Sequence, residues 1–369
     1  MKTLVTGGAG FIGTHLVREL VRRGDQVVVL DSLEEQVHGD VATELPPSVE
    51  LIVADVGNRV AADRALDGAD RVVHLAAAVG VGQSMYEIAR YVERNTMQTA
   101  IFLERLVAQR SLPKRLVVAS SMSIYGEGEY ECPEHGRIAP APRSEEQLLV
   151  RQWELVCPTC RGELAPVGTS ETKPLIPTSV YAITKRDHEE LCLVTGAAYG
   201  IPAVALRFFN AYGPGQALSN PYTGVAAIFA SRLLNGRPPI IFEDGKQSRD
   251  FIHVSDIVRG ILLALEAERA PGHAINLGTG RPSTVLQIAQ ALSAGLETEI
   301  EPIRNGQYRT GDIRHCVADP QRARELLGFD AATTLEDGMG DLLGWLADQE
   351  ATDRVDDATR ELSARGLAR

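Results

Sequence analysis

Three side chains in the middle of the chain have the types and the spacing needed to move a proton on and off an alcohol. Tyr181 and Lys185 are four residues apart, so a helix would place both side chains on one face. A lysine ammonium beside a phenol favours the phenolate, and we therefore expect the pKa of Tyr181 to be lowered toward the operating pH. Ser121, at the end of an apolar run, could share the same proton. Such a trio suits the removal of a proton from an alcohol while a hydride leaves its carbon.

Between the serine and the tyrosine, four potential metal ligands occur in two similar turns. The first turn is Cys132-Pro-Glu-His135-Gly and the second is Cys157-Pro-Thr-Cys160-Arg-Gly. Each turn aims two ligands at one point, and together they provide a Cys3His set that fits a closed, tetrahedral structural zinc site. No ligand position remains for water, so we expect this zinc to serve folding and not catalysis. The alternative is an irregular loop with reduced, unliganded thiols.

The beginning of the chain predicts a dinucleotide site. A strand expected at residues 2–5 is followed by a turn with Gly7, Gly10 and Gly13, and then by apolar residues at helical spacing. A glycine turn between a strand and a helix lets the backbone approach a pyrophosphate at the helix N-terminus. The next apolar run ends in Asp31, where a ribose-binding carboxylate belongs. The acid favours NAD over its 2′-phosphorylated form, because a carboxylate would repel that phosphate.

Apolar runs continue to alternate with helical patterns, which predicts an α/β fold with a doubly wound parallel sheet, the Rossmann arrangement. Strands are expected at residues 2–5, 26–30, 50–54, 71–75, 115–119 and 202–207. Ligands bind at the carboxyl ends of such strands. The candidate residues expected at these ends are Gly7, Asp31, Asp55, Ala76 and Ser121. The alternative for Asp55 is a cap of the following helix.

The composition is that of a globular enzyme. Of 369 residues, 44% are hydrophobic and 23% are charged, which is ordinary for such a protein. The formal net charge of -12 argues against a nucleic-acid binder, which is expected to be basic. No apolar run reaches the length needed to span a bilayer, and three of the five cysteines share one segment with a histidine, which suits a metal better than disulfides. We expect a cytoplasmic protein without nucleic-acid or membrane partners.

With these motifs in place, residues 1–330 resemble the extended short-chain dehydrogenase/reductases, in particular the NAD-dependent nucleotide-sugar epimerase/dehydratase family. The glycine turn matches the family's cofactor motif, Tyr181 and Lys185 match its catalytic pair, and Ser121 matches its catalytic serine. The resemblance implies NAD as the cofactor and a nucleotide-diphosphate sugar as the substrate. It implies cofactor contacts by Gly7, Gly10, Phe11, Ile12, Gly13, Asp31, Asp55, Val56, Ala76, Asn95 and Lys185.

Further family motifs imply a substrate site. Asn210 would contact the sugar nucleotide, and Arg249 and Arg309 would hold its pyrophosphate, a task suited to planar guanidinium groups. Ser84 and Ser123 correspond to positions near the substrate. The alternatives are an ordinary surface charge for each arginine and a buried serine at a helix start for Ser84. The histidines outside the cysteine-containing turns are assigned no functional role.

The resemblance also divides the chain into domains. The expected divisions are a NAD-binding domain of residues 1–207, to which 251–270 return, and a smaller substrate domain of residues 208–250 and 271–345. About fifty residues separate Gly126 from Tyr181, well beyond a usual connecting loop, and residues 127–175 are taken as a zinc-knuckle insertion. Residues 346–369 are expected to form a charged, solvated tail. The family often dimerises through a four-helix bundle, which implies a homodimer that uses the helix carrying Tyr181.

The two residues after Ser121 narrow the reaction. The family's 4,6-dehydratases have Asp-Glu at these positions, and its nucleotide-glucuronate decarboxylases keep the glutamate at the second. This chain has Met122 and Ser123, neither of which can act as a carboxylate acid or base. What remains is oxidation of one alcohol, rotation of the ketone and return of the hydride to its other face. That sequence is 4-epimerization, with NAD regenerated in each turnover.

The sugar is identified only by the wider pattern. Residues 76–85, the knuckle insertion and residues 219–225 resemble dTDP-L-rhamnose 4-epimerase-type sequences within the family, so the expected substrate is a dTDP-6-deoxyhexose. The first alternative is a UDP-glucuronate or UDP-galactose 4-epimerase. The second, of another class, is a non-catalytic NAD-binding sensor on the same fold. Such proteins commonly lose the tyrosine or the lysine, and this chain retains both.

Overall fold

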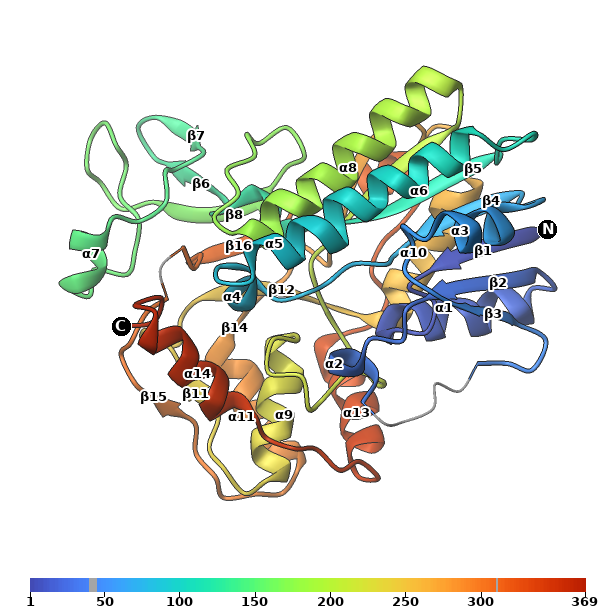
Figure 1. Ribbon diagram of the computed structural model, residues 1–369. Helices are drawn as coiled ribbons and strands as arrows, with labels where there is room; N and C mark the ends of the chain where they lie inside the picture. Colours follow the sequence, from blue (N-terminus) through green and yellow to red (C-terminus); the bar gives the residue numbers. More distant parts are fainter. Residues whose placement is uncertain (40–44, 310) are drawn as a thin grey trace.

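A parallel sheet of seven strands lies at the centre of the computed structural model, which describes residues 1–39, 45–309 and 311–369 (Figure 1). Its strand order is β13-β9-β5-β4-β1-β2-β3, and every pair is parallel. The strands are β1 (Lys2–Thr6), β2 (Gln26–Asp31), β3 (Glu50–Val53), β4 (Arg71–His74), β5 (Arg115–Ser121), β9 (Ala203–Phe208) and β13 (Ala274–Leu277). The predicted doubly wound parallel sheet is therefore confirmed. The order reverses between β1 and β4, the position at which such folds bind ligands.

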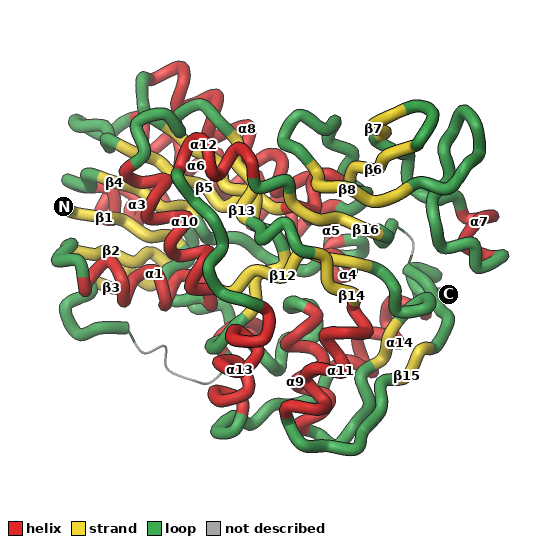
Figure 2. Tube along the Cα trace, turned by 180° about the vertical axis from the view of Figure 1, so that it is seen from behind, coloured by secondary structure: helices red, strands yellow, loops and turns green. Residues whose placement is uncertain are grey.

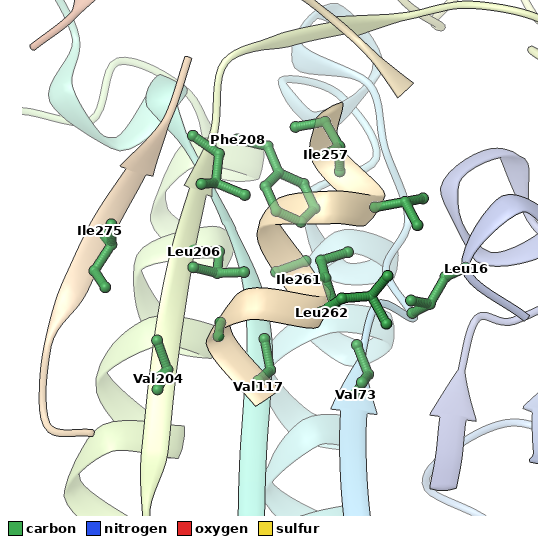
Figure 3. Packing of buried hydrophobic residues seen from close by; sticks show 14 of the residues in the cluster. Leu16, Val73, Val117, Val204, Leu206, Phe208, Ile257, Ile261, Leu262 and Ile275 are labelled. Carbon is green, nitrogen blue, oxygen red and sulfur yellow. The ribbon is translucent and has the colours of Figure 1, made fainter. Parts of the chain in front are cut away.

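Helices cover both faces of this sheet, because neighbouring strand residues point to opposite sides. On β1, Val5 belongs to one apolar core and Leu4 to the other. The first core is closed by α1 (Phe11–Arg22), α10 (Val254–Glu266) and α12 (Gln321–Leu327), and the second by α3 (Arg59–Leu66), α6 (Gln98–Val107) and α8 (Val180–Tyr199). Figure 3 shows Ile257, Ile261 and Leu262 of α10 packed over the strands. These two cores fix the strand ends that carry the candidate site.

Short helical segments connect the larger elements. They are α2 (Glu35–His38), α4 (Val81–Ser84), α5 (Ile88–Tyr91), the π-helical turn η1 (Val92–Met97) and the 3₁₀ turn η2 (Met122–Tyr125). Segments α5, η1 and α6 follow one another without a break and lie beside α8. No helix in the described residues is both long enough and apolar enough to cross a membrane.

A second sheet continues from the first toward the insertion at residues 127–175 (Figure 2). Its order is β10-β12-β16-β8-β6-β7, with β14 paired to β12. The strands are β10 (Asn210–Tyr212), β12 (Ser248–His253), β16 (His315–Ala318), β8 (Ala165–Thr169), β6 (Glu129–Cys132), β7 (Gly136–Ile138) and β14 (Pro282–Thr284), and the insertion also contains α7 (Glu145–Leu149). Because β8 pairs with β16, the insertion is part of this sheet and not a detached loop.

A third apolar core belongs to the smaller half of the molecule. It is formed mainly by α9 (Val225–Leu234), α11 (Val285–Gly295) and α13 (Leu335–Leu346), beside the two-stranded sheet of β11 (Ile240–Ile241) and β15 (Ile303–Arg304). The predicted boundary at residue 271 falls just before β13, which belongs to the main sheet. We therefore move β13 from the substrate domain, where the sequence-based division placed it, to the NAD-binding domain.

The end of the chain differs from the expected solvated tail. Residues after α13 form α14 (Val355–Ala364), and the side chains of Ala358 and Leu362 are each only 7% exposed. The high charge of this segment suggested a tail in water, but its charged residues occupy one helix face while apolar ones are buried on the other. Residues 346–369 are thus a packed part of the fold.

Candidate active site

A cavity of about 650 Å³ opens at the carboxyl ends of β1, β2, β4 and β5 and extends toward α9 and β12. All the residues proposed from the sequence for cofactor or substrate contact line this cavity, except Asn95 and Ser84. The predicted convergence of strand ends is therefore observed. The four potential metal ligands lie elsewhere, in the insertion.

The three glycines of the first turn serve two different purposes. Gly7 has a positive φ of 67°, and a Cβ there would lie 2.7 Å from the backbone nitrogen of Ala76; a Cβ on Gly13 would lie 2.3 Å from the carbonyl oxygen of Gly7. These two glycines are required by the packing of the chain itself. A Cβ on Gly10 would meet only one atom, at 3.4 Å, so the chain does not require glycine there. The open space above Gly10 fits the close approach of a ligand.

Gly10 also begins α1 without any anionic or capping side chain. The helix has no side-chain cap and no acidic residue in its first turn, so its first N–H groups and its dipole are directed at the cavity without a counter-charge. Such a helix end is suited to a pyrophosphate. The residues present therefore fit a dinucleotide at this turn.

Asp31 and Asp55 lie at the same end of the cavity. The carboxylate of Asp31 accepts hydrogen bonds from the backbone N–H groups of Ala9 (3.0 Å) and Leu33 (2.9 Å). Burial alone would raise its pKa, but the hydrogen bonds from His38 and from these two N–H groups give a net pKa below the ordinary value. Asp31 is therefore an anion that still has free lone pairs for a hydroxyl. Asp55 is ion-paired with Arg94.

Ser121, Tyr181 and Lys185 meet where β5 ends and α8 begins. The hydroxyl of Ser121 accepts hydrogen bonds from the backbone N–H (3.1 Å) and the hydroxyl (2.9 Å) of Ser123, and its proximity lowers the pKa of Tyr181. Ser179 caps α8 by accepting from the N–H of Ala182 at 3.1 Å. The first two turns of this helix therefore hold the tyrosine and the lysine in fixed positions at the cavity wall.

The pKa of Tyr181 shifts in the direction opposite to the expected one. Burial raises it to about 12, while the hydrogen bond with Ser121 lowers it. Burial also lowers the pKa of Lys185 to about 8, because both charged forms lose hydration in this apolar site. Ser121 thus lowers the pKa of Tyr181, but the effect of burial is larger and the net shift is upward. A positive charge placed beside Tyr181 would lower this pKa.

Asn95 and Ser84 lie behind the cavity wall. The Asn95 amide accepts from the N–H of Ala78 at 2.7 Å and donates to the hydroxyl of Thr184 at 2.9 Å. Ser84 accepts from the backbone N–H of Tyr181 at 3.0 Å and donates to the carbonyl of Val81 at 2.7 Å. Both side chains are fully buried. They hold the wall against α8, so the structure does not bring them to the ligand space.

The substrate candidates occupy the other end of the cavity. The Oδ1 atom of Asn210 and the Nε atom of Arg309 are buried without a hydrogen-bond partner, which fits a polar ligand. Arg309 also stacks over the ring of Phe242, with 4.4 Å between its guanidinium carbon and the ring centroid. Arg249 already has several protein partners, because its two Nη atoms donate hydrogen bonds to three backbone carbonyls and to Asp312. Its Nε remains for a ligand.

Sequence reasoning missed several residues at this site. His188 has its Nδ1 atom 3.4 Å from the Nζ of Lys185, although no role was expected for it. Gln247 lines the cavity, and its Oε1 atom is buried without a partner; its position two residues before Arg249, on the same face of an extended segment, is a signal that could have found it. The sequence also provided no indication that α14 would line the cavity.

The cysteine-containing turns form a compact cluster in the insertion. The Sγ of Cys132 is 3.6 Å from the Sγ of Cys160 and 3.5 Å from the Nδ1 of His135, and the Sγ of Cys157 is 3.6 Å from the same nitrogen. All four ligand atoms lie within 4.8 Å of one another. A disulfide needs sulfurs at about 2.05 Å, and the cysteines are free. A tetrahedron around zinc has edges of about 3.8 Å between sulfurs and about 3.5 Å between sulfur and nitrogen, so the donor set fits that ion.

Comparison with known proteins connects this geometry to a family. A model of the NAD dependent epimerase/dehydratase family matches residues 3–145 and 159–278. The chain is 34% identical over 353 residues to the dTDP-L-rhamnose 4-epimerase of Burkholderia thailandensis, covering 94% of this chain and 95% of that relative.

Two solved structures show the same architecture. The UDP-glucose 4-epimerase of Thermotoga maritima, solved with UDP-glucose, has a TM-score of 0.77 at 29% identity. A Tyr-to-Phe mutant of the UDP-glucuronic acid 4-epimerase of Bacillus cereus, solved with NAD, has a TM-score of 0.76 at 28% identity. Each alignment covers 94% of this chain and 99% of the other.

The extent of the family match agrees with the structure. It includes the glycine turn, Ser121, the Tyr181–Lys185 pair and all seven strands of the main sheet. The interval between the two matched segments, residues 146–158, lies inside the insertion and includes Cys157 of the cysteine cluster. On this match, and on the relative that shares more than 30% of its residues over nearly the full length, the chain belongs to the NAD dependent epimerase/dehydratase family.

Proposed function

We propose that this protein is an NAD-dependent nucleotide-sugar 4-epimerase that acts on a dTDP-6-deoxyhexose such as dTDP-L-rhamnose. The observation that carries the proposal is that Ser121, Tyr181 and Lys185 line the same cavity, while the residues after Ser121 are Met122 and Ser123 in place of carboxylates. Ser121 and Tyr181 can handle the proton of one alcohol, but they offer no second acid or base for elimination or decarboxylation.

The other carboxylates of the cavity support the same reaction type. Among the described residues that line it, Asp31, Glu34, Asp55 and Asp312 are the acids. Asp31 accepts from backbone N–H groups, Glu34 pairs with Arg90, Asp55 with Arg94 and Asp312 with Arg249. Each is therefore committed to a partner. A free carboxylate of the kind used by a dehydratase is not present among these residues.

In the proposed mechanism Tyr181 removes the proton from the C4 hydroxyl of the sugar and later returns it. Ser121 hydrogen-bonds the same oxygen, and the cation of Lys185, present below a pH of about 8, favours the phenolate of Tyr181. Bound NAD supplies the hydride acceptor, the hydride donor for the return step and a positive ring that further favours the phenolate. Gly10, the start of α1 and Asp31 would hold that cofactor. Asn210 and Arg309 would hold the sugar nucleotide, with Arg249 contributing its Nε.

The experiment that tests the reaction is a panel of dTDP- and UDP-sugars followed by NMR. We expect inversion at carbon 4 of a dTDP-6-deoxyhexose, at a higher kcat/KM than for any UDP-sugar. The second candidate is a UDP-glucuronate or UDP-galactose 4-epimerase, favoured by the solved neighbours described above with UDP-glucose and as a UDP-glucuronic acid epimerase. Turnover of UDP-sugars without turnover of any dTDP-sugar would support this second candidate and contradict the first. A protein that holds NAD and turns over none of the panel would instead be a sensor.

We propose in addition that Cys132, His135, Cys157 and Cys160 hold a structural zinc ion. The donor distances support this, and so does the size of the local core. The described part of the insertion has a small apolar cluster of its own, separate from the three larger cores, and a region with so little apolar burial of its own usually needs a metal or disulfides. The free thiols fit a reducing compartment, which supports the proposed cytoplasmic location.

A homodimer is proposed from the outer surface of α5, η1 and α8. Ile88 and Val92 on the first two, and Ile183 and Val194 on α8, are exposed apolar side chains, and α8 contacts both of the other segments. A substitution of both α8 residues by glutamate places charge on this face. We expect the Ile183→Glu/Val194→Glu variant to be a monomer, while the wild type and a Val60→Glu control on α3, which is outside the proposed interface, are dimers. Size-exclusion chromatography with light scattering measures this, and an unchanged mass for the double variant would refute the interface.

A further inference from the structure

The end of the chain lies against both halves of the cavity. Figure 1 shows α14 between α4 above it and α9 and α11 below it, and specific contacts agree. The side chain of Leu362 lies 3.3 Å from the position that a Cβ on Gly82 of α4 would take. At the other end, Arg232 of α9 pairs with Asp356 at 2.6 Å. The helix therefore bridges the two parts of the molecule between which a substrate would sit.

One face of α14 is directed into the cavity. Val355, Ala358, Thr359 and Leu362 line it, and their spacing of i, i+3, i+4 and i+7 is that of a single helix face. The remaining residues of the helix are mostly charged or polar and lie toward solvent, as Arg360 does with a side chain 78% exposed. The cavity-facing side carries one hydroxyl and no charge.

The anchors of this segment are polar and lie at several points along it. Asn235 donates to the carbonyl oxygen of Ala351 at 2.7 Å, ahead of the helix. Beyond the helix, the guanidinium of Arg365 stacks over the ring of Tyr86, with 4.6 Å to the ring centroid. Together with the Arg232–Asp356 pair, these contacts hold α14 in place at both ends.

The last residues fix the backbone next to a proposed phosphate ligand. Ala368 pairs with Arg309 in an antiparallel bridge. The N–H of Tyr308 donates to the carbonyl of Arg369 at 2.8 Å, and the N–H of Arg369 donates back to Tyr308 at 3.0 Å. Because the Arg309 side chain lines the cavity with its Nε unpartnered, its position depends on the segment that holds its backbone.

We propose that residues 353–369 are part of the substrate site, with the apolar face of α14 packed against the sugar and residues 368–369 positioning Arg309 for the diphosphate. The proposal rests on the nucleotide-sugar function proposed above. Leu362 is the specificity-determining residue. It packs against α4, and Ser84 of α4 accepts a hydrogen bond from the backbone N–H of Tyr181 at 3.0 Å. Leu362 is therefore linked through α4 to the helix end that carries the proposed base. An uncharged, apolar surface at this place favours a 6-deoxyhexose over a uronate, whose carboxylate would lose hydration without gaining a partner.

The test compares binding of dTDP-L-rhamnose and of dTDP alone to the NAD-loaded protein by calorimetry. In Leu362→Asp, we expect the Kd for dTDP-L-rhamnose to rise about tenfold, as expected when a carboxylate must lose hydration against the sugar, and the Kd for dTDP to stay within about twofold. The matched control is Ala364→Asp, which adds the same single negative charge at an exposed position of the same helix and should leave both constants unchanged. Equal effects of the two variants, or none from Leu362→Asp, would overturn the role of Leu362.

A chain that ends at residue 352 tests the second half of the proposal. Without the bridge to Arg309, both ligands should bind about tenfold more weakly or worse, while NAD remains bound to the main sheet. Wild-type affinity for both ligands would overturn the proposal. Binding does not require turnover, so the two hypotheses fail separately. Absence of epimerization with the expected binding changes would refute the reaction alone, and normal epimerization with unchanged binding would refute only the role of the chain end.

Discussion

Replacement of Tyr181 by phenylalanine is expected to reduce kcat by about 10³-fold, within the range by which a positioned general base accelerates proton transfer. Phenylalanine keeps the ring of Tyr181 in its buried place beside Tyr91, 6.5 Å between centroids, and removes only the hydroxyl that Ser121 contacts. The variant should therefore fold normally and retain bound NAD. The loss should appear in kcat and in kcat/KM alike, because the interaction is made in the transition state.

The matched control is Tyr199→Phe, which removes a hydroxyl from an exposed residue at the end of the same helix. We expect its kinetic constants to equal those of the wild type. Steady-state rates and the NAD content of both purified variants are the measurements. A Tyr181→Phe enzyme that keeps a tenth or more of the wild-type kcat would remove Tyr181 as the base.

Loss of the cysteine cluster is the second large effect. Structural zinc contributes on the order of 10 kcal/mol of folding free energy to small domains, and the apolar core around these ligands is small. In a Cys157→Ser/Cys160→Ser variant we expect zinc to fall from one equivalent to none by elemental analysis. We also expect residues 127–175 to become sensitive to protease, while the main sheet stays folded.

The damage should extend beyond the insertion. Glu154, three residues before Cys157, pairs with the fully buried Arg314, which also pairs with Glu243 at 2.9 Å. Removal of one partner leaves a buried charge uncompensated, which is strongly destabilising. Cys192→Ala, which removes a buried thiol from α8, is the control and should keep its zinc. A metal-free wild-type preparation with full activity and an intact insertion would contradict the zinc site.

The main sheet was predictable from the sequence because its strands are short, continuously apolar runs buried on both faces. The ends of all six predicted strands lie within two residues of the observed ones, and the glycine turn and Asp31 lie at the expected strand ends. The seventh strand, β13, was missed as part of the main sheet, since its partner β9 lies far away in the sequence. The second sheet was missed for the same reason: pairing of β8 with β16 is set by tertiary contacts, which a local pattern does not carry.

The candidate site was predictable where a motif fixes a backbone position, and less so where burial decides. The strand and helix contexts of Ser121 and Tyr181 followed from spacing, but the raised pKa of Tyr181 depends on how much of its surroundings is apolar. Asn95 and Ser84 were expected at the ligand, and only the packing of α8 reveals that they support the wall from behind. The role of α14 was hidden because the charges on its outer face dominate the composition of residues 346–369.

The proposed 4-epimerase reaction requires that a hydride leaves carbon 4 of the sugar and returns to the opposite face of the same carbon. The most direct test is to incubate the enzyme with dTDP-L-rhamnose carrying deuterium at carbon 4 in ordinary water, and to examine the product by NMR and mass spectrometry. We expect the product to be the 4-epimer, with the deuterium retained at carbon 4 and no solvent hydrogen incorporated at any carbon. Loss of the deuterium to solvent, or a product altered at another carbon, would contradict the proposed reaction.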